Sequence, residues 1–333
     1  MNRWSGARLL LTICFCAAAA VAVGLLCESV GSTGIGWPGA LQARFRLESV
    51  MDSALVGAAL AAAGVVYQAV LRNPLADPYL LGVSSGASLA AYLWRLPAIA
   101  LAIGWWGALA AVSQQTFAFA GAMIAVSIVL ALGGRRGRLE PVTVLLVGVI
   151  VNAVNGSIFL LLNALMRDLP GTGGPITFLL GGIQVITRAQ RITALVLIGI
   201  SWLDLMRMSG QLNAAALDDG EAEALGVNIH RVRMICLCEA SIMTAAAVAI
   251  SGPIGFVGLI CPHLGRLLVG FDQRRLLPTA TALGAILLML ADAASRFLAA
   301  ENRLGTQLQV GVLTGLLGGP FFLWLLFESR RKR

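Results

Sequence analysis

The stretch QAVLRNPLADPYLLGVSSGA, residues 68–87, decides the fold of this chain. Apolar residues on both sides are interrupted by a short polar run that contains Arg72, Asn73, Pro74, Asp77 and Pro78. Neither proline can continue a helix, and each pushes the preceding residue towards an extended conformation. Because the polar side chains need water while both flanks look like membrane helix, we predict a tight hairpin at a membrane face. Asn73 and Asp77 can either cap this turn or contact a partner, and capping is slightly favoured.

Composition places the whole chain in a membrane. Of 333 residues, 58% are hydrophobic and only 12% are charged, whereas soluble domains average about 25% charged residues. A spanning helix needs roughly 20 apolar residues. The sequence therefore predicts an all-α polytopic membrane protein, a single domain over 1–333, with about ten transmembrane helices at 9–27, 50–71, 79–96, 105–132, 142–166, 190–206, 231–250, 254–269, 277–298 and 309–328.

The basic residues orient this bundle. With both termini on one side, 16 of the 24 basic residues fall on that side and 8 on the other. Cytoplasmic loops carry the excess of Lys and Arg, so both termini are predicted to be cytoplasmic. The net charge of +8 follows from this bias and from attraction to anionic membrane lipid. Nucleic acid is not an expected partner, because the basic residues are spread over many loops.

Three stretches are predicted to lie outside the spans. Residues 28–49 and 167–189 are rich in glycine and polar residues and fall on the external side, with a possible short surface helix over 177–186. Residues 217–227, LDDGEAEALGV, read as a short cytoplasmic helix with acidic residues in its first turn and Gly226 at its end. Length alone leaves two readings of that helix about equal, a solvated connector or a docking element for a partner.

Candidate chemistry inside the spans is sparse. The six cysteines lack the C-x-x-C spacing of metal sites, so no metal and no cofactor is expected. The chain also lacks the G-x-x-x-x-G-K-[ST] motif of a P-loop. It is therefore predicted not to be an enzyme, and energy must come from a partner or an ion gradient. Among intramembrane carboxylates, Asp292 can pair with Arg296 one turn on, whereas Glu239 has no obvious partner; interior hydrogen bonding is favoured over proton transfer.

Several sequence blocks fall in order over about 250 residues. They are the stretch 68–87, then GEAEALGV at 220–227, GPIGFVGLICPHLGR at 252–266, DQRRLLP at 272–278, VGVLT at 310–314 and GGPFF at 318–322. Together they resemble the permease family of binding-protein-dependent ABC importers for ferric siderophores, haem and cobalamin, the type II ABC importers. This resemblance implies a ten-helix permease that pairs with a second copy of itself, two cytoplasmic ATPase subunits and a periplasmic substrate-binding protein.

The resemblance also assigns roles to residues. It makes 217–227 the helix that couples to the ATPase, through Leu217, Asp218, Asp219, Gly220, Glu221, Ala222, Leu225 and Gly226. The 72–78 turn lies on the same cytoplasmic side. A cytoplasmic gate is implied at Pro141, Val142 and Thr143, where Val142 would seal by excluding water.

Two positions depart from the family pattern. Of an external R-x-P-R pair that meets the binding protein, Arg46 is kept and Ser49 replaces the second arginine, with Arg44 and Arg303 the nearest substitutes. Gln307-Leu308-Gln309 replaces a Glu-Leu-Pro stretch before the last helix.

The function predicted from all this is inward transport across the bacterial inner membrane by alternating access. Haem or another iron chelate, such as a siderophore, is the first choice of cargo, and the ranking rests on the family's range. Cobalamin is the alternative within the family. A proton-coupled secondary transporter, using Glu239 or Asp292, is the alternative from a different class.

Overall fold

The computed structural model describes residues 6–31, 34–37, 39–94, 113–135, 138–165, 180–183, 186–215, 228–301 and 308–331. In these ranges the chain is almost entirely helical, with two short hairpins. The helices are α1 (Gly6–Glu28), α2 (Ala40–Val70), the 3-10 helix η1 (Pro78–Leu81), α3 (Val83–Trp94), α5 (Gln114–Gly133), α6 (Pro141–Leu165), α8 (Arg188–Arg207), α9 (Ser209–Ala215), α11 (Ile229–Ser251), α12 (Val257–Val269), α13 (Gln273–Glu301) and α14 (Val310–Arg331).

Each of the ten predicted spans overlaps a helix or, at 79–96, a helix pair. Seven of the described helices are long and apolar enough to cross a membrane, and α12 and α14 contain shorter apolar stretches. The predicted span 79–96 is broken into η1 and α3, and the segment predicted from residue 254 begins its helix at Val257. The possible surface helix over 177–186 does not form at 180–183, where the chain is turn and coil and Gly181 has φ 63°.

The stretch 28–49 is the clearest error of the sequence prediction. Only its first part is a loop, in which β1 (Val30–Gly31) pairs antiparallel with β2 (Gly34–Ile35). The last ten residues form the first turns of α2. The charged residues at 44–48 suggested an exposed loop, but Arg46 is only 8% exposed and its guanidinium donates to the backbone carbonyls of Glu28 (3.2 Å) and Gly36 (3.1 Å).

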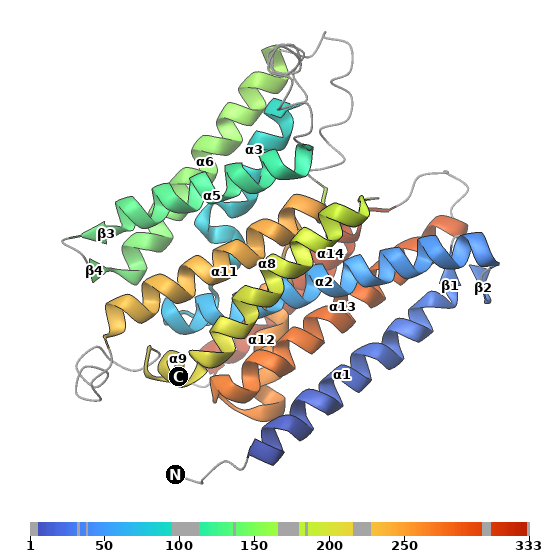
Figure 1. Cartoon of the computed structure of the whole chain (residues 1–333). Helices are drawn as coiled ribbons and strands as arrows, with labels where there is room; N and C mark the ends of the chain where they lie inside the picture. Colours follow the sequence, from blue (N-terminus) through green and yellow to red (C-terminus); the bar gives the residue numbers. More distant parts are fainter. Residues whose placement is uncertain are drawn as a thin grey trace.

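The helices run between two ends of the bundle (Figure 1). We call one the α9 end, where α1 begins, α14 finishes and α9 lies, and the other the β1 end, where the β1–β2 hairpin lies. A second hairpin, β3 (Gly134–Arg135) with β4 (Arg138–Leu139), joins α5 to α6. Helices α2, α11 and α13 form the buried centre, and α1 lies against α13 at the edge of the molecule (Figure 1).

A glycine pair sets the spacing of the two central helices. At the crossing of α2 and α13, a Cβ on Gly57 would stand 2.1 Å from the carbonyl oxygen of Gly284, and a Cβ on Gly284 would stand 2.2 Å from the oxygen of Gly57. Only hydrogen fits at either position. Small residues at helix crossings let backbones approach in a membrane, where no hydrophobic force draws helices together.

Two buried ion pairs fix the part of α2 that lies towards the β1 end. Arg191 of α8 contacts both carboxylate oxygens of Asp52, at 2.6 and 3.0 Å. Arg296 and Asp292 of α13 pair at 3.1 Å, as predicted from their spacing, and Ser49 of α2 donates to the same carboxylate at 2.8 Å. Charged groups inside a membrane protein need such partners. Together these contacts hold α2 between α8 and α13.

Candidate functional site

The polar run 72–78 is a capped turn that leads into a broken helix. The Asn73 side-chain oxygen accepts the Leu75 N–H at 3.0 Å, and the Asp77 carboxylate accepts the Tyr79 N–H at 3.0 Å, so both side chains cap as predicted. Pro78 starts η1, and Gly82, with φ 79°, ends it in a left-handed conformation that glycine adopts without strain. The chain then continues as α3.

The first residues after this turn hold the loop 252–256, which joins α11 to α12. The Tyr79 hydroxyl accepts a hydrogen bond from the Ile254 N–H. Asp77 also takes a backbone hydrogen bond from Phe256, whose φ of 69° is unusual for a bulky residue. Removal from water raises the pKa of Asp77 to about 6, although its bonds to the Tyr79 and Phe256 N–H groups favour the ionised form. The turn and the loop therefore form one hydrogen-bonded unit.

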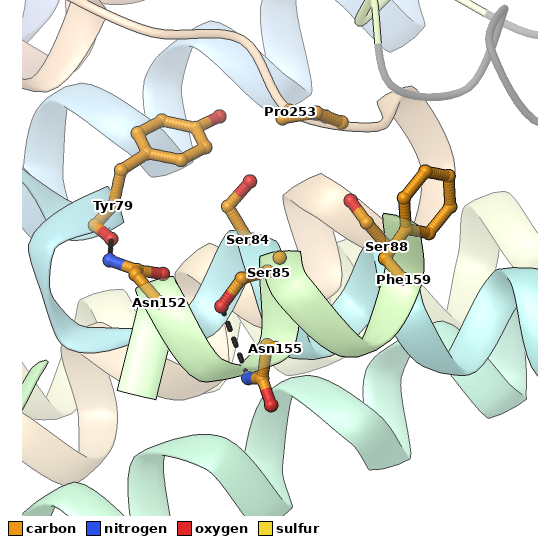
Figure 2. A pocket seen from close by; sticks show the side chains of 9 residues that line it. Tyr79, Ser84, Ser85, Ser88, Asn152, Asn155, Phe159 and Pro253 are labelled. Atoms are coloured by element: carbon orange, nitrogen blue, oxygen red, sulfur yellow. Dashed lines mark hydrogen bonds between the residues drawn. The ribbon is translucent and has the colours of Figure 1, made fainter. Parts of the chain in front are cut away.

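Next to this unit lies a cavity of about 340 Å³, which we call the polar niche. Its walls come from η1 and α3, from α6, and from the loop 252–256 (Figure 2). The lining residues are Tyr79, Ser84, Ser85, Ser88, Asn152, Asn155, Gly156, Phe159 and Pro253. Most of the surface that they expose to the niche is apolar; the polar side-chain groups among them are hydroxyls and amides, with no carboxylate or basic side chain. The niche can therefore offer weak, uncharged hydrogen bonds, which suits a group that passes rather than one that is held.

Two asparagines of α6 connect the walls of the niche. Asn152 donates its amide to the backbone carbonyl of Tyr79 at 2.8 Å, and Asn155 donates to the Ser85 hydroxyl at 3.1 Å (Figure 2). Both amides come from one face of α6, three residues apart, and both reach across to the broken helix. The amide oxygens of these asparagines are not used in these two bonds.

Close backbone contacts keep the broken helix in place. A Cβ on Gly148 of α6 would stand 2.1 Å from the Leu80 carbonyl oxygen, and one on Gly258 of α12 would stand 2.7 Å from Pro78. Gln68, in the last turn of α2, donates to the Gly258 carbonyl at 3.2 Å. The sequence QAVLRNPLADPYLLG thus places η1 against α6 and α12 at once.

The predicted functional residues are not gathered at the niche. In the predicted cytoplasmic turn, Arg72 and Pro74 are exposed. Asp77 does not line the niche, but its carboxylate accepts the N–H of Tyr79, which does. The predicted gate, Pro141 to Thr143, is the first turn of α6 at the α9 end. There the Val142 side chain is 73% exposed, and Thr143 donates to Glu140 at 2.8 Å.

The residues predicted to meet a binding protein differ in exposure. Arg44 lies near the β1 end with an 80% exposed side chain and pairs with Glu48 at 3.3 Å. Arg46 is buried against the β1–β2 hairpin, as described above. Ser49, which stands where the family has the second arginine, donates a hydrogen bond to the Asp292 carboxylate inside the bundle. Arg303 and the coupling residues 217–227 lie outside the described residues.

Sequence reasoning missed Asn152, Asn155 and Ser88. A signal was available, because two amides three residues apart in an apolar 25-residue helix are polar residues facing one side inside a membrane.

Glu239, on α11, is half-buried, and the hydrogen bond favoured for it from sequence is absent from the part of the chain that the structure describes. The alternative role for Glu239, proton transfer, stays a prediction.

The fold and the niche together define a class of protein. A bundle of membrane-spanning helices, in which a broken helix and its neighbours line a pocket without charged side chains, is typical of a membrane transport subunit. The chain belongs to the FecCD transport family, whose profile matches residues 7–328. It is a transport component and not an enzyme.

Named relatives and a solved structure agree with this family. The chain is 39% identical to the hemin transport system permease HmuU of Yersinia pestis, over 86% of this chain and 83% of that one. It is 37% identical to the cobalamin import system permease BtuC of Halobacterium salinarum, over 84% and 72%. A metal-chelate type ABC transporter solved in an inward-facing conformation superposes with a TM-score of 0.80 and 26% identity, covering 96% of this chain and 99% of that one.

Proposed function

We propose that this chain is the membrane-spanning permease of an ATP-driven importer that moves haem or another iron chelate across the bacterial inner membrane. The polar niche on a broken helix, in a chain that the FecCD family matches almost from end to end, carries this proposal. Relatives named for hemin, for iron chelatin and for iron(3+)-hydroxamate support an iron chelate as the cargo. Cobalamin is the second candidate, on the strength of two relatives named for its import.

The partners follow from the class of importer. An ATPase subunit pair supplies the energy, and a substrate-binding protein delivers the cargo. Within the importer, a second copy of this chain completes the pathway. The wide apolar face of α6 is consistent with that pairing, since only 17% of its most apolar stretch is buried within the single chain. Membrane lipid covers whatever apolar surface the second copy leaves open.

The proposed orientation places the α9 end in the cytoplasm, with both termini. The coupling helix 217–227 then follows α9 directly and docks on the ATPase, while Val142 stands at the cytoplasmic mouth as a gate. The β1 end faces the binding protein. There Arg44, exposed near the bundle surface, is better placed for docking than Arg46, whose guanidinium is occupied by two backbone carbonyls.

The proposed mechanism is alternating access with weak contact at the niche. Nucleotide binding closes the ATPases, the coupling helices move with them, and the paired permeases exchange outward-facing and inward-facing shapes. A site lined by hydroxyls and amides without charge gives a cargo modest hydrogen bonds on its way. Strong binding would oppose release, so a weak niche fits the task of a pathway better than that of a receptor.

Import by a reconstituted complex tests the proposal. Proteoliposomes that contain the permease, its ATPase and a binding protein are given haem, a ferric hydroxamate or cobalamin, with ATP inside, and uptake is measured. We expect one iron chelate to be imported in an ATP-dependent way. Asn152→Ala and Asn155→Ala should each lower the uptake rate severalfold, because they remove the niche amides.

Asn163→Ala is the matched control for those variants. It makes the same change on α6 at a position that does not line the niche, and uptake should stay at the wild-type rate. Equal effects of all three substitutions would contradict the role of the niche. Uptake that proceeds without ATP and follows a pH gradient would instead support the proton-coupled alternative, and Glu239→Gln should then abolish it.

A further inference from the structure

Helix α9 ends where the proposed coupling segment begins, and its side chains contact two other elements. It spans Ser209–Ala215, and Leu212 and Ala215 are fully buried. From Ala215 the chain continues directly towards 217–227. A displacement of that segment by an ATPase can therefore reach the membrane helices through α9 on one side and through α11, which begins at Ile229, on the other.

Asn213 joins α9 to the start of α13. Its amide oxygen accepts the Gln273 N–H at 2.8 Å, and its amide nitrogen donates to the Asp272 carboxylate at 2.8 Å. Gln273 is the first residue of α13, where a backbone N–H has no partner within the helix. The Asp272 carboxylate also accepts the Arg274 N–H at 3.1 Å, so it caps the same helix. One side chain from α9 thus completes the N-terminus of another helix.

Arg72 joins α9 to the turn that leads to the niche. Its Nε lies 3.4 Å from the Ala215 carbonyl oxygen, the last carbonyl of α9. Arg72 has φ 49°, a left-handed conformation that costs a residue with a side chain about 1–2 kcal/mol. A strained residue persists where the surrounding structure requires it. Glycine would fill this position without strain but could not reach α9.

We propose that Asn213 is the positioning residue that passes movement of the coupling segment to the junction of α12 and α13 and, along α12, to one wall of the polar niche. Through Asp272 and Gln273 it holds the junction that follows the last residue of α12, and the opposite end of α12 adjoins the loop 252–256, which contains Pro253 of the niche. Arg72 provides the second link, through the turn to Tyr79. This inference rests on the proposed function, because it assumes that an ATPase moves 217–227.

Exchanging the side chains of Asn213 and Asp272 tests the hydrogen bond between them without removing it. Asn213→Asp alone sets two carboxylates against each other where the amide now donates at 2.8 Å. Asp272→Asn alone keeps an oxygen that can accept from both Asn213 and the Arg274 N–H. The double variant restores a donor and an acceptor in exchanged positions, and an asparagine still caps α13 well. Gln211→Glu, on the exposed face of α9, is the control for added negative charge.

The readout is cargo imported per ATP hydrolysed in the reconstituted complex, together with the melting temperature of each variant. We expect Asn213→Asp to lower this ratio at least tenfold while ATP hydrolysis stays within about twofold of wild type. The double variant should return to within about threefold of wild type, and Asp272→Asn and Gln211→Glu should stay near it. Asn213→Gln, which keeps the amide on a longer stem, should retain part of the coupling.

Two results would overturn the inference. One is a wild-type ratio in Asn213→Asp. The other is a double variant no better than Asn213→Asp although both melt at the wild-type temperature. If the double variant melts lower, its ratio is compared with that of Asn213→Asp at matched folded fractions, and a double variant that is no better still overturns the inference. Failure of the proposed function looks different, because then the wild-type complex itself shows no ATP-dependent import.

Discussion

Replacing Gly57 with alanine should separate the two central helices. The new Cβ would stand 2.1 Å from the Gly284 carbonyl oxygen, with Leu288 Cβ at 2.8 Å. Ordinary contact needs more than 3 Å, so α2 and α13 must move apart by roughly 1 Å along a crossing where both backbones are rigid. Overpacking of this kind costs about 1–3 kcal/mol. We expect Gly57→Ala to lower the free energy of unfolding by that amount.

The control for this change is Gly199→Ala on α8. No atom outside its own helix lies within 4 Å of a Cβ at position 199, and alanine favours a helix over glycine by about 0.5–1 kcal/mol. Gly199→Ala should therefore be neutral or stabilising. The two variants should differ by about 1.5–4 kcal/mol in unfolding from mixed micelles by SDS, followed by circular dichroism. Equal stability of the two proteins would refute the reasoning from the glycine crossing.

Three further predictions concern charged residues. Folding raises the pKa of Asp77 to about 6 from an ordinary value near 3.8, so between these pH values the folded protein binds more protons than the unfolded chain. The free energy of unfolding should therefore fall by up to about 3 kcal/mol as the pH rises from 4 to 6. Asp77→Asn should flatten that slope in melting curves, and an unchanged slope would exclude Asp77 as its source. Arg72→Gly relieves the left-handed strain and should raise the melting temperature slightly while lowering import per ATP, because the contact with Ala215 is lost; a parallel fall of both would mean that Arg72 is structural alone. Arg296→Met leaves Asp292 as a buried unpaired charge and should cost about 3–5 kcal/mol in SDS unfolding, so a loss below 1 kcal/mol would show that water reaches the pair.

Hydrophobic patterning was sufficient to find the helices. Spans such as 142–166 and 231–250 match α6 and α11 to within two residues, because an apolar run of that length has one stable form in lipid. The pairing of Asp292 with Arg296 was also predictable, since residues four apart lie on one helix face. The capping roles of Asn73 and Asp77 followed from the preference of these side chains for turns.

Features that depend on long-range contacts were beyond the sequence. The start of α2 was misplaced because Arg46 looks solvated, whereas its partners are carbonyls 10 and 18 residues away. Asn213 carried no signal at all, since its role arises only when α9 meets the first turn of α13. The niche is assembled from three separated segments, so its polar residues could be noticed one by one but not brought together.

The neutral lining of the niche has an electrical consequence. A side chain with a formal charge would move within the membrane field as the permease changes shape, and each elementary charge is worth about 2.3 kcal/mol per 100 mV. The niche residues contribute no such gating charge. Within the niche the voltage therefore acts on the cargo and not on the lining, so an anionic chelate would enter a negative-inside cell against the potential, and a neutral one would be indifferent to it.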